Sequence, residues 1–139
     1  MKPPKKKNAV TRRIGALVIL LQGTDAPSTS EWNECIQLVS KTTDLNATKV
    51  LVVTDGGGPD LSQRQKLESV LRGTTVSSAV VSDSVRVRFI VATVALFSSK
   101  ISTFTKSEIG KAYQFLGLTP DEVELAKKAV VEMRQELEM

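Results

Sequence analysis

The feature that most constrains the fold is a strand–helix–strand pattern in residues 78–104. Residues 78–82 form a short run rich in valine, and residues 101–104 form a second short run that starts and ends on apolar side chains. The segment between them opens at Asp83 or Ser84, either of which is a suitable helix N-cap. Its apolar side chains then recur at helical spacing: Val87, Ile90, Val91 and Val94. Two parallel strands joined by a helix form a βαβ crossover, and its helix has to cover a sheet.

Two other apolar runs predict the central strands of that sheet. Residues 16–21 are apolar at every position, which indicates burial on both faces, as in a central parallel strand. A short antiparallel partner ending near Arg12 and Arg13 is a further option within residues 9–21. Residues 49–54 form the second central strand.

Helix start signals fall between and after these strands. In chain order they are the capping box Ser28–Glu31, the N-cap Asp60 before residues 61–71, the capping box Thr105–Glu108 before a helix to about Leu116, and Thr119–Glu122. The last is the clearest, because a threonine cap is followed by proline at the first helical position and glutamate at the third. The side chains expected to face the sheet are Trp32, Cys35, Ile36 and Val39; Leu61, Leu67, Val70 and Leu71; Ile109, Ala112, Phe115 and Leu116; and Val123, Ala126, Val130, Met133 and Leu137.

The alternation of strands and helices predicts an α/β fold. We expect one domain, a mostly parallel sheet of four to five strands covered by helices, over residues 9–118. Residues 1–8 are expected to be a disordered basic tail. Residues 119–139 are expected to add an amphipathic C-terminal helix. Its apolar stripe either packs on its own domain or pairs with a second subunit in a homodimer.

Composition argues against several classes of function. The 139 residues include 19 basic and 15 acidic ones, but four of the basic ones lie in the tail, so the folded body is neutral. A specific nucleic-acid binder carries its positive charge on the folded surface, so we expect no nucleic-acid partner. The chain has no histidine, which removes the commonest general base and the commonest transition-metal ligand. We therefore expect no metal site, no cofactor and no enzymatic activity.

The single cysteine and the short apolar runs bear on location. Cys35 shares a helical face with Trp32, so we interpret it as a buried apolar group and not as a nucleophile. One cysteine forms no intramolecular disulfide, which fits a reducing compartment. The longest apolar run, residues 14–21, is too short to span a bilayer. The basic start lacks a signal-like apolar stretch, so we expect a cytoplasmic protein.

Loops at the carboxyl ends of parallel strands share one edge of a sheet. Residues 23–25, 55–62, 83–88 and 105 should then form one surface, termed here the strand-end face. It combines carboxylates, hydroxyls, helix N-termini and arginines, which suits an anionic group or a protein partner. The candidate binding residues are Asp55, Gly56, Gly57, Gly58, Asp60, Ser62, Arg64, Asp83, Ser84 and Arg86.

The glycine loop in this face has two interpretations. A glycine loop between a strand and a helix can cradle a phosphate. Residues 55–60, however, match neither common phosphate-binding glycine motif, and no lysine follows them, so a mobile turn is the simpler interpretation. Asp55 and Asp60 alone do not define a metal site.

Two segments carry a family resemblance. Residues 79–118 (AVVSDSVRVRFIVATVALFSSKISTFTKSEIGKAYQFLGL) give a strand, a helix opening on Asp-Ser, a strand ending in Phe and a further helix. Residues 51–71 (LVVTDGGGPDLSQRQKLESVL) give a strand, a loop and a helix. In this order the chain resembles the STAS domains, in particular the SpoIIAA-like branch, also described as STAS/SEC14-like. The resemblance covers most of residues 9–118 and implies a regulatory binding module that acts through protein partners, without chemistry of its own.

The resemblance also implies a candidate phosphorylation position. Anti-sigma-factor antagonists of the wider family carry a phosphorylated serine in an Asp-Ser-Ser-Gly setting at the start of this second helix. The corresponding residues here are Pro59-Asp60-Leu61-Ser62-Gln63, so Ser62 is the candidate although the Asp-Ser-Ser-Gly sequence is missing.

Two functional hypotheses follow. In the first, the strand-end face binds a protein, a regulator or a kinase, with Ser62 as a phosphoserine switch. In the second, the domain binds a small ligand, an anionic nucleotide or a lipid, at the helix N-termini or in a gap under the helices. A large apolar cavity would favour the lipid, and a flat hydroxyl-rich face would favour the protein.

Overall fold

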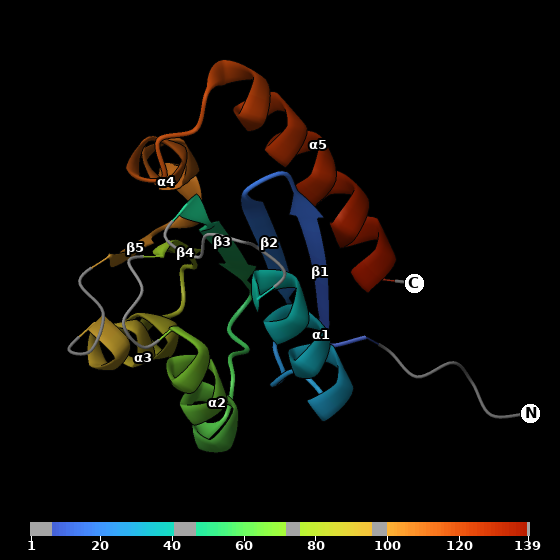
Figure 1. The fold of residues 1–139 in the computed structure, drawn as a ribbon, viewed down its shortest axis with the longest axis vertical. Coiled ribbons are helices and arrows are strands. Elements are labelled where there is room, and N and C mark those ends of the chain that lie inside the picture. Colours follow the sequence, from blue (N-terminus) through green and yellow to red (C-terminus); the bar gives the residue numbers. More distant parts are fainter. Residues whose placement is uncertain (1–6, 41–46, 72–75, 96–99, 139) are drawn as a thin grey trace, which may run out of the picture.

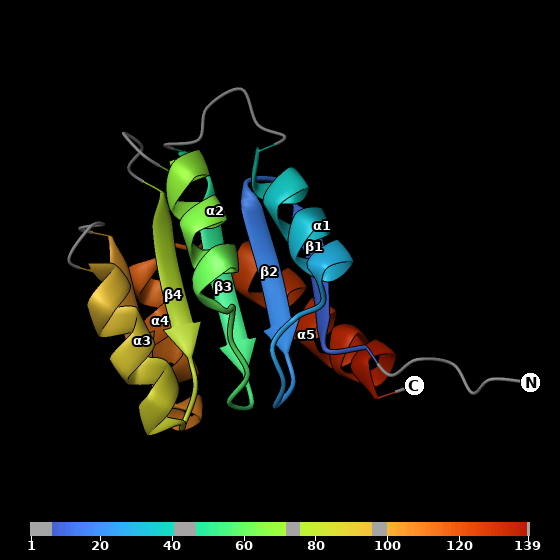
Figure 2. The ribbon, with the colours of Figure 1, turned by 90° about the horizontal axis from the view of Figure 1, so that it is seen from below.

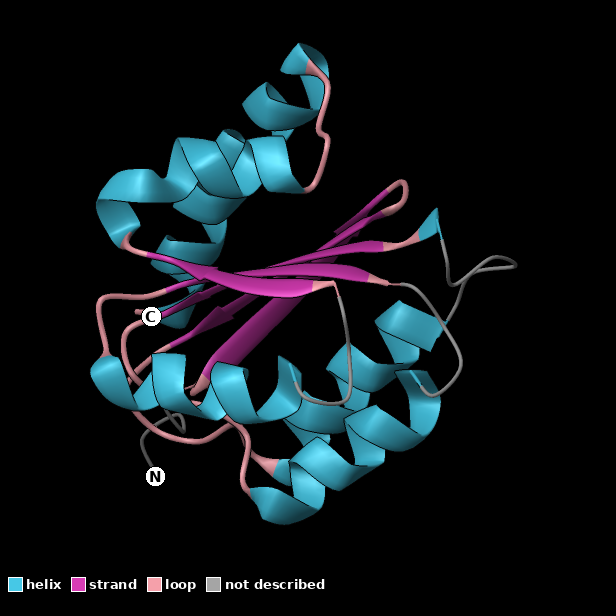
Figure 3. Cartoon of the chain, turned by 90° about the vertical axis from the view of Figure 1, so that its left-hand side faces the viewer, coloured by secondary structure: helices cyan, strands magenta, loops and turns pink. Residues whose placement is uncertain are grey.

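The computed structural model describes residues 7–40, 47–71, 76–95 and 100–138. It shows a five-stranded sheet between two layers of helices (Figure 3). The strands lie in chain order across the sheet: β1 (Ala9–Ile14), β2 (Leu17–Gln22), β3 (Lys49–Thr54), β4 (Ser77–Val81) and β5 (Ile101–Phe104). Strands β2 to β5 are parallel, and β1 is antiparallel to β2. The predicted α/β fold with a mostly parallel sheet is confirmed.

The first two strands form a hairpin. Gly15 lies in the turn at a φ of 58°, a left-handed conformation that glycine adopts without a steric penalty. The antiparallel strand that the sequence left as an option is therefore present, and it extends past Arg13 to Ile14.

Three crossover helices cover one face of the sheet. Figures 1 and 2 show α1 (Thr29–Ser40), α2 (Leu61–Leu71) and α3 (Val85–Ala95) on the same side of the strands that they connect. The Ser28–Glu31 capping box forms at the start of α1, since each backbone N–H donates to the other residue's side-chain oxygen. At α3 the cap is Ser84, whose Oγ accepts from the N–H of Val87.

The opposite face is covered by the C-terminal helices. A 3₁₀ turn at Lys106–Glu108 leads into α4 (Ile109–Phe115), and α5 (Pro120–Leu137) follows. The Thr119 capping box that the sequence indicated opens α5. Residues of α4 and α5 share one core cluster with the strand side chains of this face: Leu17, Ile19, Leu21, Leu51, Val53, Ala79, Val81, Ala112, Tyr113, Leu116, Ala126, Ala129, Met133 and Leu137. The apolar stripe of α5 is thus used within its own chain.

One expected inward position on α4 is wrong. Phe115 is 42% exposed, although its ring lies 5.8 Å from that of Phe104, and Tyr113 is buried in its place. Ala112 and Leu116 are buried as expected, and Tyr113, three residues before Leu116, extends that face.

The expected inward face of α2 is only partly right: Leu67, Val70 and Leu71 face inward, but Leu61 does not. No residue of α2 is buried, and Leu61 is 62% exposed. Leu67, Val70 and Leu71 are only half-buried against the cluster under α1. On α3, by contrast, Val87 and Val91 are buried as expected. The side chain of Val94 lies outside the described residues.

The N-terminal segment contacts the domain at its described end. Lys7 Nζ lies 2.8 Å from a carboxylate oxygen of Glu136, and the N–H of Asn8 donates to Glu31. These two residues were expected in the disordered tail, and their contacts with α5 and α1 correct that boundary. The rest of the expected tail, residues 1–6, lies outside the described residues.

Candidate functional site

Two carboxylates of the strand-end face are engaged in fold contacts. Asp55 binds Lys106 Nζ at 2.9 Å and Arg134 Nη1 at 2.5 Å. Burial alone would raise the pKa of Asp55, but the hydrogen bonds and charges of Lys106 and Arg134 outweigh it and hold the pKa below its ordinary value. Asp83 accepts from the backbone N–H of Lys106 at 2.9 Å. These contacts join the loops after β3, β4 and β5 to α5.

The glycine loop serves close packing. Gly57 donates its N–H to the carbonyl of Gly23 at 2.8 Å, and a Cβ added at Gly57 would lie 2.2 Å from the carbonyl oxygen of Asp25. Gly56, at a φ of 133°, donates its N–H to Thr54 Oγ1 at 3.1 Å. Two of the three glycine N–H groups are therefore used inside the protein, which favours the turn interpretation over a phosphate cradle.

Three other residues predicted for the strand-end face, Asp60, Ser62 and Arg64, lie at the start of α2. Asp60 Oδ1 accepts from the N–H of Gln63 at 2.8 Å, and Gln63 Oε1 accepts from the N–H of Asp60 at 2.9 Å, so the cap is reciprocal. Ser62 is exposed in the first turn, and Arg64, two residues further, is half-buried. Arg86 is exposed in the first turn of α3. Arg64 therefore points inward while Ser62 and Arg86 face solvent.

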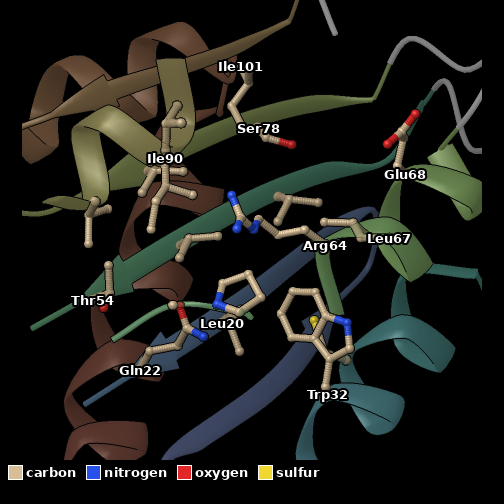
Figure 4. Close-up of a pocket in the computed structure, with 18 of the residues that line it drawn as sticks. Leu20, Gln22, Trp32, Thr54, Arg64, Leu67, Glu68, Ser78, Ile90 and Ile101 are labelled. Carbon is tan, nitrogen blue, oxygen red and sulfur yellow. The ribbon is translucent and has the colours of Figure 1, made fainter. Parts of the chain in front are cut away.

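A cavity of about 460 Å³ lies between the sheet and the helices α1 to α3 (Figure 4). Its floor is formed by alternate side chains of β2, β3 and β4, which point to the same face of the sheet, and by one side chain of β5. These residues are Leu20, Gln22, Val50, Val52, Thr54, Ser78, Val80 and Ile101. Its walls come from the loop before α2 and from the three helices: Trp32, Cys35, Val39, Gly57, Gly58, Pro59, Leu61, Arg64, Gln65, Leu67, Glu68, Leu71, Val87, Ile90 and Val91. The cavity separates the core cluster under α1 from the smaller cluster under α3.

The cavity exists because α2 is held away from the sheet. The indole Nε1 of Trp32 on α1 donates to the backbone carbonyl of Gln63 at 2.9 Å. The side-chain amide of Gln63 donates to the carbonyl of Pro27 at 2.8 Å. The first turn of α2 thus hydrogen-bonds to α1 and the loop before it. The side of α2 that faces the gap carries Leu67 and Leu71 but also Arg64, whose charged group does not fill an apolar space.

Two cavity-lining residues have buried polar atoms without a partner. In the part of the chain that the structure describes, three buried side-chain nitrogens or oxygens lack a hydrogen bond, and two of them are Gln22 Nε2 and Arg64 Nε. Gln22 is only 1% exposed. Figure 4 shows the Arg64 side chain extending from α2 into the cavity above the strands. Buried polar groups are normally satisfied, so unpaired donors at a cavity mark a place for a polar ligand group.

The polar groups are unevenly distributed along the cavity. Gln22 and Thr54 are paired at the carboxyl ends of β2 and β3, and Arg64 is in the half of α2 nearest those ends. Val50 and Ser78 pair at the amino ends. Between these ends, the floor consists of Leu20, Val52 and Val80. The cavity therefore has a polar, positively charged end and an apolar middle.

Cys35 also lines the cavity. Burial raises the pKa of its thiol to about 11, so it is protonated at neutral pH. This fits its predicted role as a small apolar group. Among the described residues there is no group of three or more potential protein ligands arranged for a metal ion. No helix in the described part of the chain is both long and apolar enough to cross a membrane.

Comparisons with protein-family models, with curated proteins and with solved structures found no match to this chain. The resemblance to the STAS domains therefore stays a prediction.

Sequence reasoning missed the two residues that distinguish the cavity. Gln22 was not singled out, and Arg64 was assigned to the strand-end face. Signals for both were present. Gln22 ends a run of apolar residues that had to be buried, so its amide had to be buried as well. Arg64 lies at helical spacing from Leu67 and Leu71, on the stripe expected to face the sheet.

Proposed function

We propose that the protein is a binding module that takes a small, largely apolar ligand into the cavity under α2. The observation that carries this proposal is an apolar cavity of about 460 Å³ with unpaired buried donors on Gln22 and Arg64. Small-molecule sites typically span about 300–1,000 Å³ and combine apolar walls with a few polar groups.

The lining of the cavity supports an apolar occupant. The cavity opens to solvent, and Leu61 on its wall is 62% exposed. Its middle is aliphatic and offers water few hydrogen-bond partners, so an apolar ligand that displaces water there gains the free energy of burying apolar surface.

Trp32 provides a direct test. It is the only tryptophan in the chain, it is 3% exposed, and it lines the cavity. We expect N-phenylnaphthylamine, a neutral apolar fluorophore, to bind with energy transfer from Trp32. Val52→Phe should weaken this binding at least tenfold by filling the floor. Val131→Phe makes the same change at an exposed position of α5 and should bind like the wild type. Absence of saturable binding, or equal binding by both variants, would contradict the proposal.

A second candidate function is protein binding at the strand-end face. It is favoured by exposed apolar side chains beside the predicted polar residues: Leu61, next to Ser62, is 62% exposed, and Val85, next to Arg86, is 79% exposed. A phosphate on Ser62 would be tolerated by the helix N-terminus and would place nearly two negative charges beside these side chains. The partner in this case is a regulator or a kinase.

The switch can be tested independently of the cavity. Ser62→Glu and Ser62→Ala should both melt close to the wild type, because Ser62 is exposed. Only Ser62→Glu should lose a partner recovered from the native cell by affinity purification. Equal recovery by both variants, with no phosphate on Ser62 in native protein, would rule out the switch.

A further inference from the structure

The polar groups that line the cavity concentrate at one end. Arg64 lies in the half of α2 nearest the carboxyl ends of the strands, and Gln22 and Thr54 lie at those ends. Figure 4 shows the Arg64 side chain extending into the cavity. A negatively charged ligand group is therefore attracted to the Arg64 end.

The donors at the Arg64 end match an anionic group. A guanidinium presents a planar fork of N–H donors that fits a carboxylate or a phosphate, and its charge roughly doubles the strength of each hydrogen bond. Gln22 adds an amide Nε2 that is buried without a partner. An anionic group that reaches both Arg64 and Gln22 would satisfy both donors, whereas a purely apolar ligand would leave them unpaired.

The rest of the cavity fits one unbranched chain. From Thr54 to Val50 the floor follows β3 over four residue steps, which is about 13 Å at the usual rise of a strand. The volume of 460 Å³ is roughly three times that of a cavity that holds benzene, which leaves room for about eighteen non-hydrogen atoms. A chain of about twelve carbons with an anionic head has that size and length.

We propose that the ligand is a single-chain amphiphile with an anionic head, a carboxylate or a phosphate monoester, held between Arg64 and Gln22. Its alkyl chain lies over Val52 between α2 and α3 and points toward Val50. This inference rests on the cavity function proposed above and adds the chemical class and orientation of the ligand.

Three ligands of equal chain length distinguish the contribution of the head group to affinity from that of the alkyl chain. Dodecanoate, dodecyl phosphate and dodecanol are titrated at pH 8 by calorimetry, the two anions below their micelle-forming concentrations and dodecanol below its solubility limit. The wild type should bind at least one of the anions tenfold or more tightly than dodecanol. The more tightly bound anion identifies the head as carboxylate or phosphate.

Variants of Arg64 test whether the preference for an anionic ligand arises in the cavity. Arg64→Gln should remove the tenfold preference for the anion and leave the affinity for dodecanol within about twofold. Arg64→Lys keeps the charge without the planar fork and should retain part of the preference. Arg88→Gln removes an equal charge from an exposed position on α3 and should behave like the wild type. The two conservative replacements at Arg64, both at a half-buried position, guard against a result caused by misfolding.

The outcomes separate the two proposals. Equal affinity of the wild type for dodecanol and both anions would overturn the anionic head and leave the cavity function standing. An anion preference that survives Arg64→Gln would overturn the assigned orientation. No binding of any of the three ligands, together with no binding of the neutral fluorophore, would overturn both proposals.

Discussion

Replacing Gln22 with leucine is expected to stabilise the free protein and to impair ligand binding. Gln22 is 1% exposed and its Nε2 has no hydrogen-bond partner. A buried unpaired polar group destabilises a protein by about 1–3 kcal/mol. Leucine has a similar size and carries no polar atom, so Gln22→Leu should raise the free energy of unfolding by that amount. For a chain of this length the melting temperature should rise by about 4–12 °C.

The neighbouring strand end provides a matched control. Thr54 faces the same cavity, but its Oγ1 lies 2.5 Å from the carbonyl of Gly57 and accepts from the N–H of Gly56. Thr54→Val removes these bonds and should lower stability by about 1–3 kcal/mol. The two polar-to-apolar changes are thus expected to have opposite signs, which urea unfolding measures directly.

The same pair of variants tests the reasoning. If Gln22→Leu destabilises the protein as much as Thr54→Val, the Gln22 amide is hydrogen-bonded in the free protein, and its assignment as an unpaired donor is wrong. If Gln22→Leu stabilises the protein, its affinity for the anionic amphiphile should fall by about fivefold or more, because one donor to the head is lost. A stabilised variant with unchanged anion affinity would remove Gln22 from the site.

Three other predictions concern the surrounding structure. Asp55→Asn should destabilise the protein by about 1 kcal/mol at neutral pH. The folded-state pKa of Asp55 is lowered, so its contribution to the free energy of unfolding is complete above its ordinary pKa of about 4 and is lost as the pH falls through the folded-state value. Plots of unfolding free energy against pH for the wild type and the variant should therefore converge in acid. Parallel plots would disprove the ion pairing. Val87→Asp should prevent folding because Val87 is buried against the sheet. The sequence pattern places Ile90 on the same apolar face, but Ile90 is half-buried at the cavity, so Ile90→Asp should fold and lose ligand binding. An unfolded Ile90→Asp protein would mean that Ile90 packs against the sheet as Val87 does. Cys35, with a pKa of about 11, should react with thiol reagents at pH 8 far more slowly than the unfolded chain, and equal rates would show that Cys35 is not buried under α1.

The sequence was sufficient to predict the strands, the crossovers and most of the caps. Those features depend on local chemistry: residues 16–21 are apolar throughout, and Ser28, Asp60 and Thr119 form the hydrogen bonds expected of them. The cavity could not be predicted in the same way. It depends on how far α2 lies from the sheet, which is set by contacts between Trp32, Gln63 and Pro27 that are distant in sequence.

Burial of the C-terminal stripe was also only partly predictable. Its periodicity identified Ala126, Met133 and Leu137 as inward positions, and all three are buried. Periodicity alone did not decide between the chain's own sheet and a second subunit. The structure shows the stripe packed on its own strands, and the homodimer stays a prediction without support. The partner of Asp55 on α5, Arg134, was likewise invisible because 79 residues separate them.

The two outer strands of the sheet determine how the domain behaves when molecules are crowded together. An exposed edge strand offers unpaired backbone groups that another chain can extend into an aggregate. Strand β1 carries Arg12 and Arg13 on one edge, and β5 on the other edge is only four residues long. Charge and short length are both common protections against edge-to-edge pairing. Continuation of the sheet from one molecule into the next is therefore disfavoured at both edges, and concentrated solutions of this domain should resist fibril formation.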